Sequence, residues 1–332
     1  MRVFITGANG FVGSNLCRYF RAKGWDVFGL VRPTSDLHFL DGLGVELVVG
    51  DLRDPGSFDL PEDLDFVVHA AAITSDMADE EACRRNILEP AVSLAAKIEA
   101  LRPRPKRVVV ISTALVLGFA AAAISEERPG RPADFIPYTR FKAESERHFL
   151  ARWRDARLPV VVLRPGDIFG PNDRVTCGKL LKAIEQGVPA VVGRGRSRFG
   201  YCYVGNLNQA VDLALATEGI EGRAYTVTNG KLPTWGEFFG GLQRALGRKQ
   251  RLYVPAWTAF AAAGLMAGIR KLRPSYEPSL TYYRIKRVVT ETTYDISRTV
   301  AELGYAPDDD QDRQIREIVD WYRVEKRNGH IK

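Results

Sequence analysis

The chain has 332 residues, 45% of them hydrophobic and 26% charged, with a formal net charge of +7. This composition is typical of a globular protein with one large core or two modest ones, and it excludes a disordered or fibrous chain. Because the basic residues are scattered and no apolar run is long enough to cross a bilayer, we expect no nucleic-acid partner and no stable membrane insertion.

The cysteines and the N-terminus indicate the compartment. The four cysteines lie far apart, without a C-x-x-C pair or a histidine at metal-ligand spacing. We expect them to be buried small hydrophobes in a reducing compartment, with no metal site. The chain begins directly with an apolar strand and shows no signal peptide, so a cytoplasmic location is predicted.

The first thirteen residues predict a nucleotide-binding turn. Residues 3–5 are typical of a buried strand, and three glycines follow with the spacing G-x-x-G-x-x-G before an amphipathic segment. The first permits the turn, the second lets a phosphate approach the backbone, and the third lets the helix lie close to the sheet. The helix start offers free N–H groups to an anion. The expected cofactor-binding positions are Gly7, Gly10, Phe11, Val12 and Gly13. The alternative is a tight turn without a ligand.

The next predicted strand bears on the choice of cofactor. It covers residues 27–31 and has no carboxylate after it before Asp36. In dinucleotide folds that use NAD, an acidic residue here holds the ribose diol. Arg32 can instead pair with a 2′-phosphate, and Thr34 or Ser35 can add a hydroxyl. We therefore expect NADP(H) in preference to NAD(H). NAD(H) remains an alternative cofactor, and an ordinary surface position remains an alternative for Arg32.

Two further strands place candidate contacts to the cofactor. After the strand at 45–49, Asp51 can accept from the adenine amino group while Leu52 packs on the ring, although Asp51 as a turn or helix cap is an equal alternative. We expect His69, at the end of the strand over 66–69, to be a hydrogen-bonded core residue. The small side chains that follow let a flat cofactor pass, and they belong to Ala70, Ala71 and Ala72.

Two long helices complete the alternating pattern. One is predicted over 79–100, with Asn86 near its middle, and the other over 135–154. Tyr138 and Lys142 are four residues apart in the second helix, so they share a face. Strands that alternate with helices predict an α/β fold with a parallel, doubly wound sheet of the Rossmann type.

Six motifs in this order resemble the extended short-chain dehydrogenase/reductase family, within the epimerase/dehydratase superfamily. They are TGANGFVG at 6–13, Asp51-Leu52 with His69-Ala70-Ala71-Ala72, Asn86, Ser112-Thr113-Ala114, Tyr138-x-x-x-Lys142 and Leu163-Arg164-Pro165-Gly166. The resemblance implies an NAD(P)-binding Rossmann domain over 1–170, with a later return near 200–228. A smaller, discontinuous substrate domain is expected mainly in 171–332.

The resemblance assigns catalytic roles to Thr113, Tyr138 and Lys142. Hydride transfer to a ketone builds negative charge on its oxygen, so a proton donor must lie beside it. Tyr138 is the expected acid in reduction and the base in oxidation. A tyrosine has a pKa near 10, so a cation must stabilise its phenolate, and Lys142 supplies it. The resemblance adds that Lys142 binds the nicotinamide ribose and that Thr113, with Ser112 as a less favoured substitute, bonds to the reacting oxygen.

The remaining expected contacts come from the resemblance too. Further cofactor contacts are expected from Asn86, Tyr138, Lys142, Pro165, Gly166 and Ile168. Substrate contacts are expected from Thr74, Thr113, Asp167 and Arg198.

Two departures from family patterns bear on the reaction. Dehydratases of the family have an Asp-Glu pair where this chain has Ala114-Leu115, so we do not expect dehydration. Nucleotide-sugar epimerases have an Arg-Asp pair near the positions of Phe199 and Gly200, and Arg198 comes one residue early. This weakens a nucleotide-sugar substrate without excluding it, because the basic loop 193–198 is as readily a phosphate clamp as a solvated loop.

The second half of the chain is less regular. Its expected elements are a strand at 160–163, a helix at 179–186, an extended piece at 190–192, a helix at 206–217, a strand at 225–227 and an N-capped helix start at Thr234. Residues 255–272 form an apolar segment too short to span a bilayer. It can line an apolar pocket, cap a lid or rest on a membrane, and the ordinary interpretation is a packed helix. With the segments 294–298 and 302–305 it is similar to the branch of 3β-hydroxysteroid dehydrogenases and dihydroflavonol reductases.

We therefore expect an NAD(P)-dependent oxidoreductase that moves a hydride between nicotinamide and a secondary alcohol or ketone of a small, apolar or cyclic substrate. The main alternative is a nucleotide-sugar epimerase that oxidises and re-reduces its substrate. A second is a catalytically idle, cofactor-sensing protein. The resemblance of the two long helices to a family dimer interface predicts a homodimer.

Overall fold

A parallel sheet organises the chain in the computed structural model, which describes residues 1–187, 191–249, 253–273, 276, 278 and 280–331. Within this part, seven strands are ordered β3-β2-β1-β4-β5-β6-β9, and every pairing is parallel. The strands are β1 (Arg2–Thr6), β2 (Asp26–Val31), β3 (Glu46–Val49), β4 (Phe66–His69), β5 (Arg107–Ile111), β6 (Val160–Pro165) and β9 (Ala224–Val227). The order reverses between β1 and β4, and such a switch point is where α/β sheets bind ligands.

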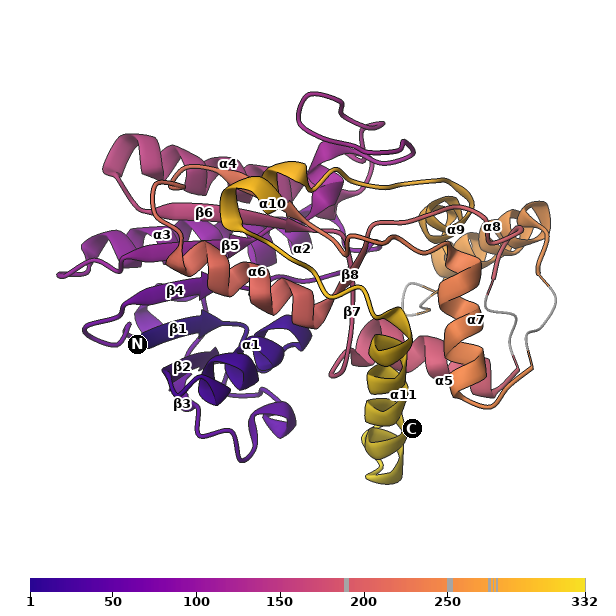
Figure 1. The fold of residues 1–332 in the computed structure, drawn as a ribbon, viewed down its shortest axis with the longest axis horizontal. Helices are drawn as coiled ribbons and strands as arrows, with labels where there is room; N and C mark the ends of the chain where they lie inside the picture. Colours follow the sequence, from indigo (N-terminus) through magenta and orange to yellow (C-terminus); the bar gives the residue numbers. More distant parts are fainter. Residues whose placement is uncertain (188–190, 250–252, 274–275, 277, 279, 332) are drawn as a thin grey trace.

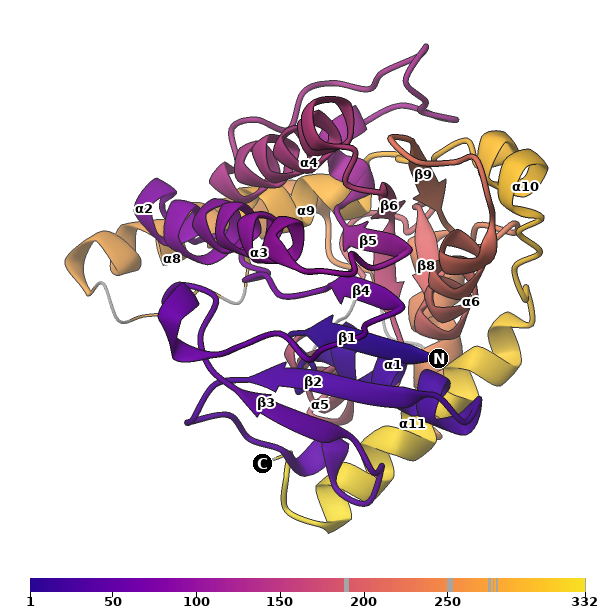
Figure 2. The same ribbon diagram turned by 90° about the vertical axis from the view of Figure 1, so that its left-hand side faces the viewer.

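Helices cover both faces of this sheet, as Figures 1 and 2 show. The helices that flank it are α1 (Phe11–Ala22), α2 (Glu80–Cys83), α3 (Glu89–Ala100), α4 (Pro137–Ala156), α6 (Val204–Ala216) and α10 (Ser297–Leu303). One hydrophobic cluster joins the sheet to α1 and α6, and another joins it to α3 and α4. The central strands are buried on both faces, which explains their continuous apolar sequences. The predicted Rossmann-type α/β fold is confirmed.

The later part of the chain builds a second cluster beside the carboxyl ends of the strands. It contains the parallel pair β7 (Asp167–Phe169) and β8 (Tyr201–Tyr203), with α5 (Lys179–Glu185), α7 (Trp235–Ala245) and α11 (Gln311–Arg327). The rings of Phe199 and Trp235 stack with centroids 3.8 Å apart. Thr234 and Glu237 form the capping box that starts α7, as predicted. This aromatic core holds the second unit against the β6–β7 segment.

Two helices differ from the prediction. The helix expected over 79–100 is interrupted by a π-helical turn, Arg84–Leu88, which contains Asn86. Such turns often occur at functional sites and leave no mark in hydrophobic periodicity. The helix expected over 255–272 exists as α8 (Ala256–Leu272), but only Ala259 and Ala263 are buried in it. The ordinary interpretation of a packed helix is therefore wrong for most of its surface.

Helix α9 (Tyr282–Val289) packs beside α8 through a small cluster with Val192 and Val254. The extended piece predicted at 190–192 lies partly outside the described residues, and Val192 forms a parallel bridge with Val254. None of the helices in the described ranges is long and apolar enough to cross a membrane.

Candidate active site

The glycine turn has the conformation that its sequence predicts. Gly7 has φ +68°, which favours glycine, and its carbonyl accepts the Gly10 N–H at 2.9 Å. A Cβ on Gly13 would lie 2.1 Å from the Gly7 carbonyl oxygen, so α1 can start here only with glycine. Gly10 is exposed, and its position before Phe11 and Val12 leaves the first N–H groups of α1 open to an anion.

The adenosine end of the expected cofactor site lies beside this turn. Arg32 directly follows β2 and is exposed. The backbone N–H of Arg32 donates to the Ser35 hydroxyl at 3.1 Å. The Asp51 carboxylate accepts two hydrogen bonds from the Arg53 side chain at Oδ2, one of them at 2.5 Å. These bonds and, to a smaller extent, the charge of Arg32 hold the pKa of Asp51 below its usual range. Leu52 is buried.

The strand end at 69–72 is fixed by polar bonds to β1. The Thr6 hydroxyl lies 2.9 Å from His69 Nδ1 and also accepts the Ala71 N–H at 3.2 Å. His69 is buried, and burial lowers its pKa to about 3, with the charge of Lys142 adding to the effect. His69 is therefore a neutral, hydrogen-bonded core residue, as predicted. Ala70 and Ala72 are partly exposed, which leaves this edge open.

The three expected catalytic residues come from two neighbouring elements. Thr113 follows β5 and is 7% exposed, and its Oγ1 accepts the Leu115 N–H at 3.3 Å. Tyr138 and Lys142 lie one turn apart near the start of α4. The Lys142 Nζ donates to the Ile111 carbonyl of β5 at 2.8 Å, which fixes α4 against the strand that leads to Thr113.

The electrostatics of this group suit proton donation to a ketone oxygen. Burial raises the pKa of the Tyr138 phenol, with smaller contributions from Tyr283 and Cys83, so the phenol is protonated at neutral pH. Burial lowers the pKa of Lys142 to about 8, and the nearby Glu146 carboxylate opposes this. Lys142 is therefore mostly charged at neutral pH. A protonated phenol one helical turn from a cationic lysine can act as the acid in carbonyl reduction.

A buried ionic network behind Lys142 was missed by the sequence interpretation. Glu146, one turn after Lys142, accepts the Ser112 hydroxyl at 2.7 Å and the Arg164 Nε at 3.0 Å. Arg164 also reaches Glu126 at 2.5 Å. Ser112 is thus bound to Glu146, which leaves Thr113 as the hydroxyl available to a substrate. The i,i+4 spacing of Lys142 and Glu146 was the signal that could have revealed this network.

Helix α9 supplies a second set of residues that the sequence interpretation missed. The Arg287 guanidinium is buried and forms an ion pair with Asp167 of β7. Burial alone would lower the pKa of Arg287, but Asp167 and then Tyr283 raise it overall. Burial raises the pKa of Tyr283 to about 12. Asp167 was expected to contact substrate, and in this structure it holds Arg287, more than a hundred residues away in the chain, which no local pattern could reveal.

The other expected cofactor contacts lie in the π-helical turn and at the junction of β6 and β7. Asn86 donates to the Ala82 carbonyl at 2.8 Å within the π-helical turn. Pro165 is buried at the end of β6, and a Cβ on Gly166 would lie 2.1 Å from the Gly200 carbonyl oxygen. Ile168 packs partly buried between two hydrophobic clusters. The junction of β6 and β7 is therefore closely packed at Gly166, where the nicotinamide is expected to pass.

Two expected substrate residues have exposed side chains. Thr74 lies in the loop after β4. Arg198 pairs through its backbone with Thr234, and its charge contributes to lowering the pKa of Glu237 in the capping box. Among the described residues, no hydrogen bond or ion pair joins the side chain of Thr74 or Arg198 to the expected catalytic residues.

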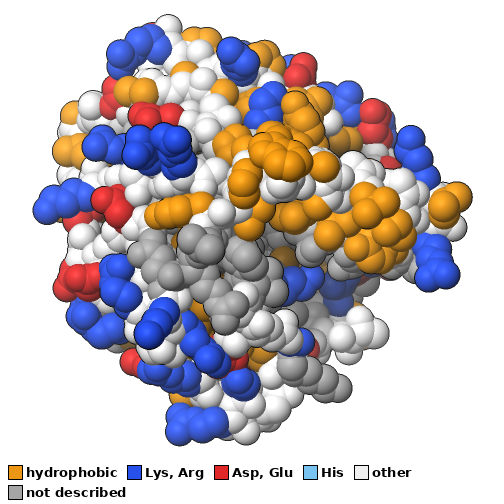
Figure 3. Space-filling view, turned by 90° about the vertical axis from the view of Figure 1, so that its right-hand side faces the viewer, with side chains coloured by type: hydrophobic (Ala, Val, Ile, Leu, Met, Phe, Trp, Pro, Cys, Tyr) orange, Lys and Arg blue, Asp and Glu red, His pale blue; other side chains and the backbone are white. Residues whose placement is uncertain are grey.

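An apolar cavity of about 600 Å³ lies between α8, α9 and the loop after β4. Its lining includes Phe260 and Ala263 of α8, Met77 of the loop, and Tyr282 of α9. Tyr282 directly precedes Tyr283, whose phenol acts on the pKa of Tyr138. Figure 3 shows hydrophobic side chains gathered on this end of the molecule. Consecutive residues of α9 thus connect the two sites, since Tyr282 lines the cavity and Tyr283 acts on the expected catalytic residue Tyr138.

Comparison with known proteins agrees with this site. The sequence model of the NAD dependent epimerase/dehydratase family matches residues 3–228. A ketoreductase from Stigmatella aurantiaca, which acts on 4-hydroxy-2-methyl-3-oxo-4-farnesyl-3,4-dihydroquinoline-1-oxide by its name, is 31% identical over 92% of each chain. Sterol demethylase protein B from Methylococcus capsulatus is 30% identical over 97% of this chain and 98% of its own.

Solved structures show the same fold. The UDP-glucuronic acid 4-epimerase from Bacillus cereus, in complex with UDP-glucuronic acid and NAD, superimposes with a TM-score of 0.77 at 20% identity, over 98% of this chain and 99% of its own. The match covers the sheet, the glycine turn and the second unit. The expected resemblance is confirmed: the chain belongs to the NAD dependent epimerase/dehydratase family and is an extended short-chain dehydrogenase/reductase.

Proposed function

We propose that this oxidoreductase reduces a ketone, or oxidises the corresponding secondary alcohol, on a small apolar or cyclic substrate. The proposal rests on the apolar cavity between α8, α9 and the loop after β4, one of whose lining residues, Tyr282, directly precedes the Tyr283 that contributes to the pKa of Tyr138. Apolar walls favour an apolar ligand by about 25 cal/mol per Å² of buried surface. The names of two relatives, one with a farnesyl group and one with a sterol, support the same substrate class.

The proposed reaction uses residues described above. A nicotinamide cofactor, when bound, would supply or accept the hydride. Tyr138 donates a proton to the ketone oxygen, Thr113 holds that oxygen, and the Lys142 charge stabilises the phenolate left behind. The glycine turn and the exposed N–H groups of α1 suit the cofactor pyrophosphate.

We propose NADP(H) as the preferred cofactor. Arg32 is exposed at the end of β2, and the nearest acidic side chain in sequence, Asp36, forms an ion pair with Arg174 at 2.6 Å. Asp36 is therefore engaged elsewhere, and Arg32 is positioned to meet a 2′-phosphate. Dissociation constants for NADPH and NADH test this preference. Arg32→Glu should weaken NADPH binding about tenfold or more and leave NADH binding nearly unchanged. Equal affinities in the unaltered protein would contradict the preference.

The apolar substrate class is tested by narrowing the cavity. Ala267 lines it and lies on α8. Ala267→Trp should raise KM about tenfold or more for bulky ketones and leave kcat for small ketones nearly unchanged. Ala261→Trp, an exposed position of the same helix outside the cavity lining, is the matched control. Equal kinetics of the two variants with bulky ketones would contradict the assignment.

A nucleotide-sugar epimerase is the second candidate. The buried Arg287 of α9, beside β7, is the observation that favours it, because a guanidinium there can bind a diphosphate. The ion pair with Asp167 opposes it, since the charge is already neutralised. Interconversion of a UDP-sugar by the protein with NADP⁺ or NAD⁺, without net formation of reduced cofactor, would identify this activity. A cofactor-sensing protein would bind NADPH and turn over neither class.

The assembly and location are further proposals. We propose a homodimer through α3 and α4, where Val92 is 43% exposed on α3. Solution scattering that gives a monomeric mass would contradict it. We also propose two domains, with 1–170 and a return near 200–228 forming the cofactor domain, since β9 joins the seven-stranded sheet. The four cysteines are buried free thiols, which supports a reducing, cytoplasmic location.

A further inference from the structure

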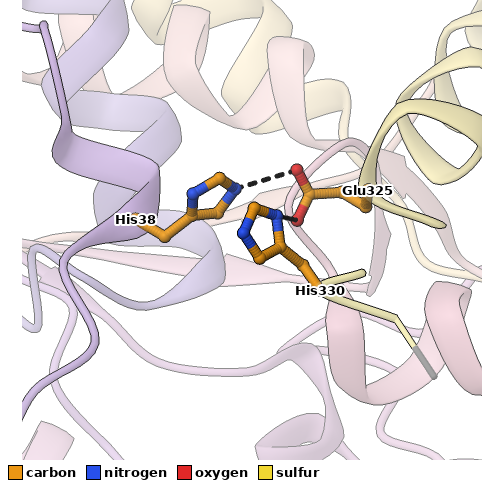
Figure 4. Close-up of side chains that lie close together, drawn as sticks. All are labelled: His38, Glu325 and His330. Carbon is orange, nitrogen blue, oxygen red and sulfur yellow. Dashed lines mark hydrogen bonds and ion pairs between the residues drawn. The ribbon is translucent and has the colours of Figure 1, made fainter. Parts of the chain in front are cut away.

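Two histidines and a glutamate from distant parts of the chain meet at one point, as Figure 4 shows. His38 lies in the turn after β2, Glu325 lies in the last turns of α11, and His330 follows that helix. The His38 Nε2 is 2.9 Å from Glu325 Oε1, and the His330 Nδ1 is 3.6 Å from Glu325 Oε2. Because 287 residues separate His38 from Glu325, a search for closely spaced ligands could not find them.

The backbone holds these side chains in place. Gly329 has φ +77°, which reverses the chain after α11, and the His330 N–H then donates to the Glu325 carbonyl at 2.9 Å. On the other side, the His38 N–H donates to Asp36 Oδ1 at 3.0 Å. The two imidazole rings lie with centroids 3.8 Å apart. The cluster is therefore pre-organised rather than a chance approach of long side chains.

The carboxylate at its centre lacks a full set of partners. Glu325 is 4% exposed, and its Oε2 is buried without a hydrogen bond. Arg174 Nη2 is 3.5 Å from this oxygen, but Arg174 also pairs with Asp36 at 2.6 Å and lies over the Phe39 ring at 4.3 Å. A buried, incompletely satisfied carboxylate is costly unless a cation compensates it. The atoms that surround it suggest which cation.

We propose that His38, Glu325 and His330 bind a divalent first-row transition ion, with Zn²⁺ as the best fit. Two imidazoles and one carboxylate are a known zinc donor set, with bonds of about 2.0–2.2 Å. In a tetrahedral site such bonds separate the ligand atoms by about 3.3 Å. The observed separations of 2.9 Å from His38 to Oε1 and 3.6 Å from His330 to Oε2 are near this value, to different oxygens of the Glu325 carboxylate, and one ligand atom from each residue lies within 4.8 Å of the other two. His330 is exposed, so water can take the fourth position.

The location gives the ion a structural role. It joins the loop after β2, which carries Arg32 and Ser35, to the C-terminal end of α11. The ion pair between Asp36 and Arg174 also connects the loop after β2 to the segment before α5. An ion at this point stabilises the folded chain and the loop at the adenosine end of the cofactor site, without taking part in hydride transfer.

Zinc binding by the full-length, tag-free chain tests the proposal. Isothermal titration with Zn²⁺ should give one ion per chain. His38→Ala and His330→Ala should each weaken the affinity about tenfold or more, and the double variant should bind none at this site. His148→Ala removes a histidine of α4 that is outside the cluster and should behave like the unaltered protein. Circular dichroism checks that the variants fold.

Two further measurements identify the kind of ion. Co²⁺ in place of Zn²⁺ should give the visible absorption of a tetrahedral site, and an excess of Mg²⁺ should not displace it, since imidazole ligands disfavour Mg²⁺. Zn²⁺ should also raise the thermal unfolding midpoint of the unaltered protein and not that of the double variant. Absence of stoichiometric binding, or equal binding by the double variant, would overturn the proposal.

Discussion

Lys142 is predicted to reduce the stability of the protein at neutral pH while it supports catalysis. Burial lowers its pKa from 10.5 to about 8. At 1.36 kcal/mol per pH unit, this corresponds to about 3 kcal/mol with which the folded protein disfavours the ammonium. Lys142→Met keeps the length of the side chain and removes this cost. It also removes the hydrogen bond to the Ile111 carbonyl, worth about 1 kcal/mol. We expect the variant to be about 2 kcal/mol more stable at pH 7.

The pH dependence has a definite sign. Because the pKa of Lys142 is lower in the folded than in the unfolded chain, the unfolded chain binds more protons between pH 8 and 10.5. The cost is fully present below pH 8 and disappears as the pH rises towards 10.5. The stability advantage of Lys142→Met should therefore shrink across this window.

Urea unfolding of the two proteins at several pH values measures this difference. The midpoint should shift while the slope stays constant. Lys182→Met, at an exposed position of α5, is the control and should show no such pH-dependent difference. A Lys142→Met variant that is less stable than the unaltered protein at pH 7, or a difference that does not change with pH, would refute the reasoning. The variant should lose turnover about 100-fold or more in either case.

Three further substitutions test separate parts of the site. Tyr138→Phe should lower turnover about 100-fold or more and leave NADPH affinity nearly unchanged, because only the proton donor is lost; normal turnover in stopped assays would reject its role. Gly13→Ala places a Cβ 2.1 Å from the first carbonyl oxygen of the turn, so NADPH affinity by fluorescence titration should fall about tenfold or more. Gly268→Ala, in open space on α8 outside the cavity lining, should leave NADPH affinity unchanged, and equal effects of the two would contradict the steric argument. Glu146→Gln removes the charge that opposes the loss of the Lys142 proton, so the high-pH fall of kcat should move about one pH unit lower; an unchanged profile would count against this coupling.

The first half of the chain could be predicted because its signals are local. The glycine spacing at Gly7, Gly10 and Gly13 imposes the turn by sterics alone, and the four-residue spacing of Tyr138 and Lys142 places both on one face of α4. Apolar runs of four to six residues marked the buried strands. These patterns depend only on neighbours in the sequence, which explains why the sheet agrees with the prediction and why Tyr138 and Lys142 share a face of α4 as expected.

The rest depends on contacts between distant residues. The partner of Asp167 is Arg287 on α9, and the partner of His38 is Glu325 on α11. Neither pair has a sequence signature. The exposed surface of α8 is a similar case, since its apolar composition predicted burial and the tertiary structure leaves Trp257 74% exposed. Periodicity identifies which residues are apolar, but only the packing decides which of them are covered.

The most direct test of the central claim is the near-ultraviolet absorbance of NADPH mixed with the protein and a panel of ketones. The panel should contain bulky apolar and cyclic ketones, small ketones and UDP-sugars. The proposed reductase should consume NADPH steadily with an apolar or cyclic ketone and not with a UDP-sugar. If no ketone consumes NADPH, while in a parallel assay with NADP⁺ or NAD⁺ a UDP-sugar is interconverted without net change of the cofactor, this site does not belong to an apolar ketone reductase.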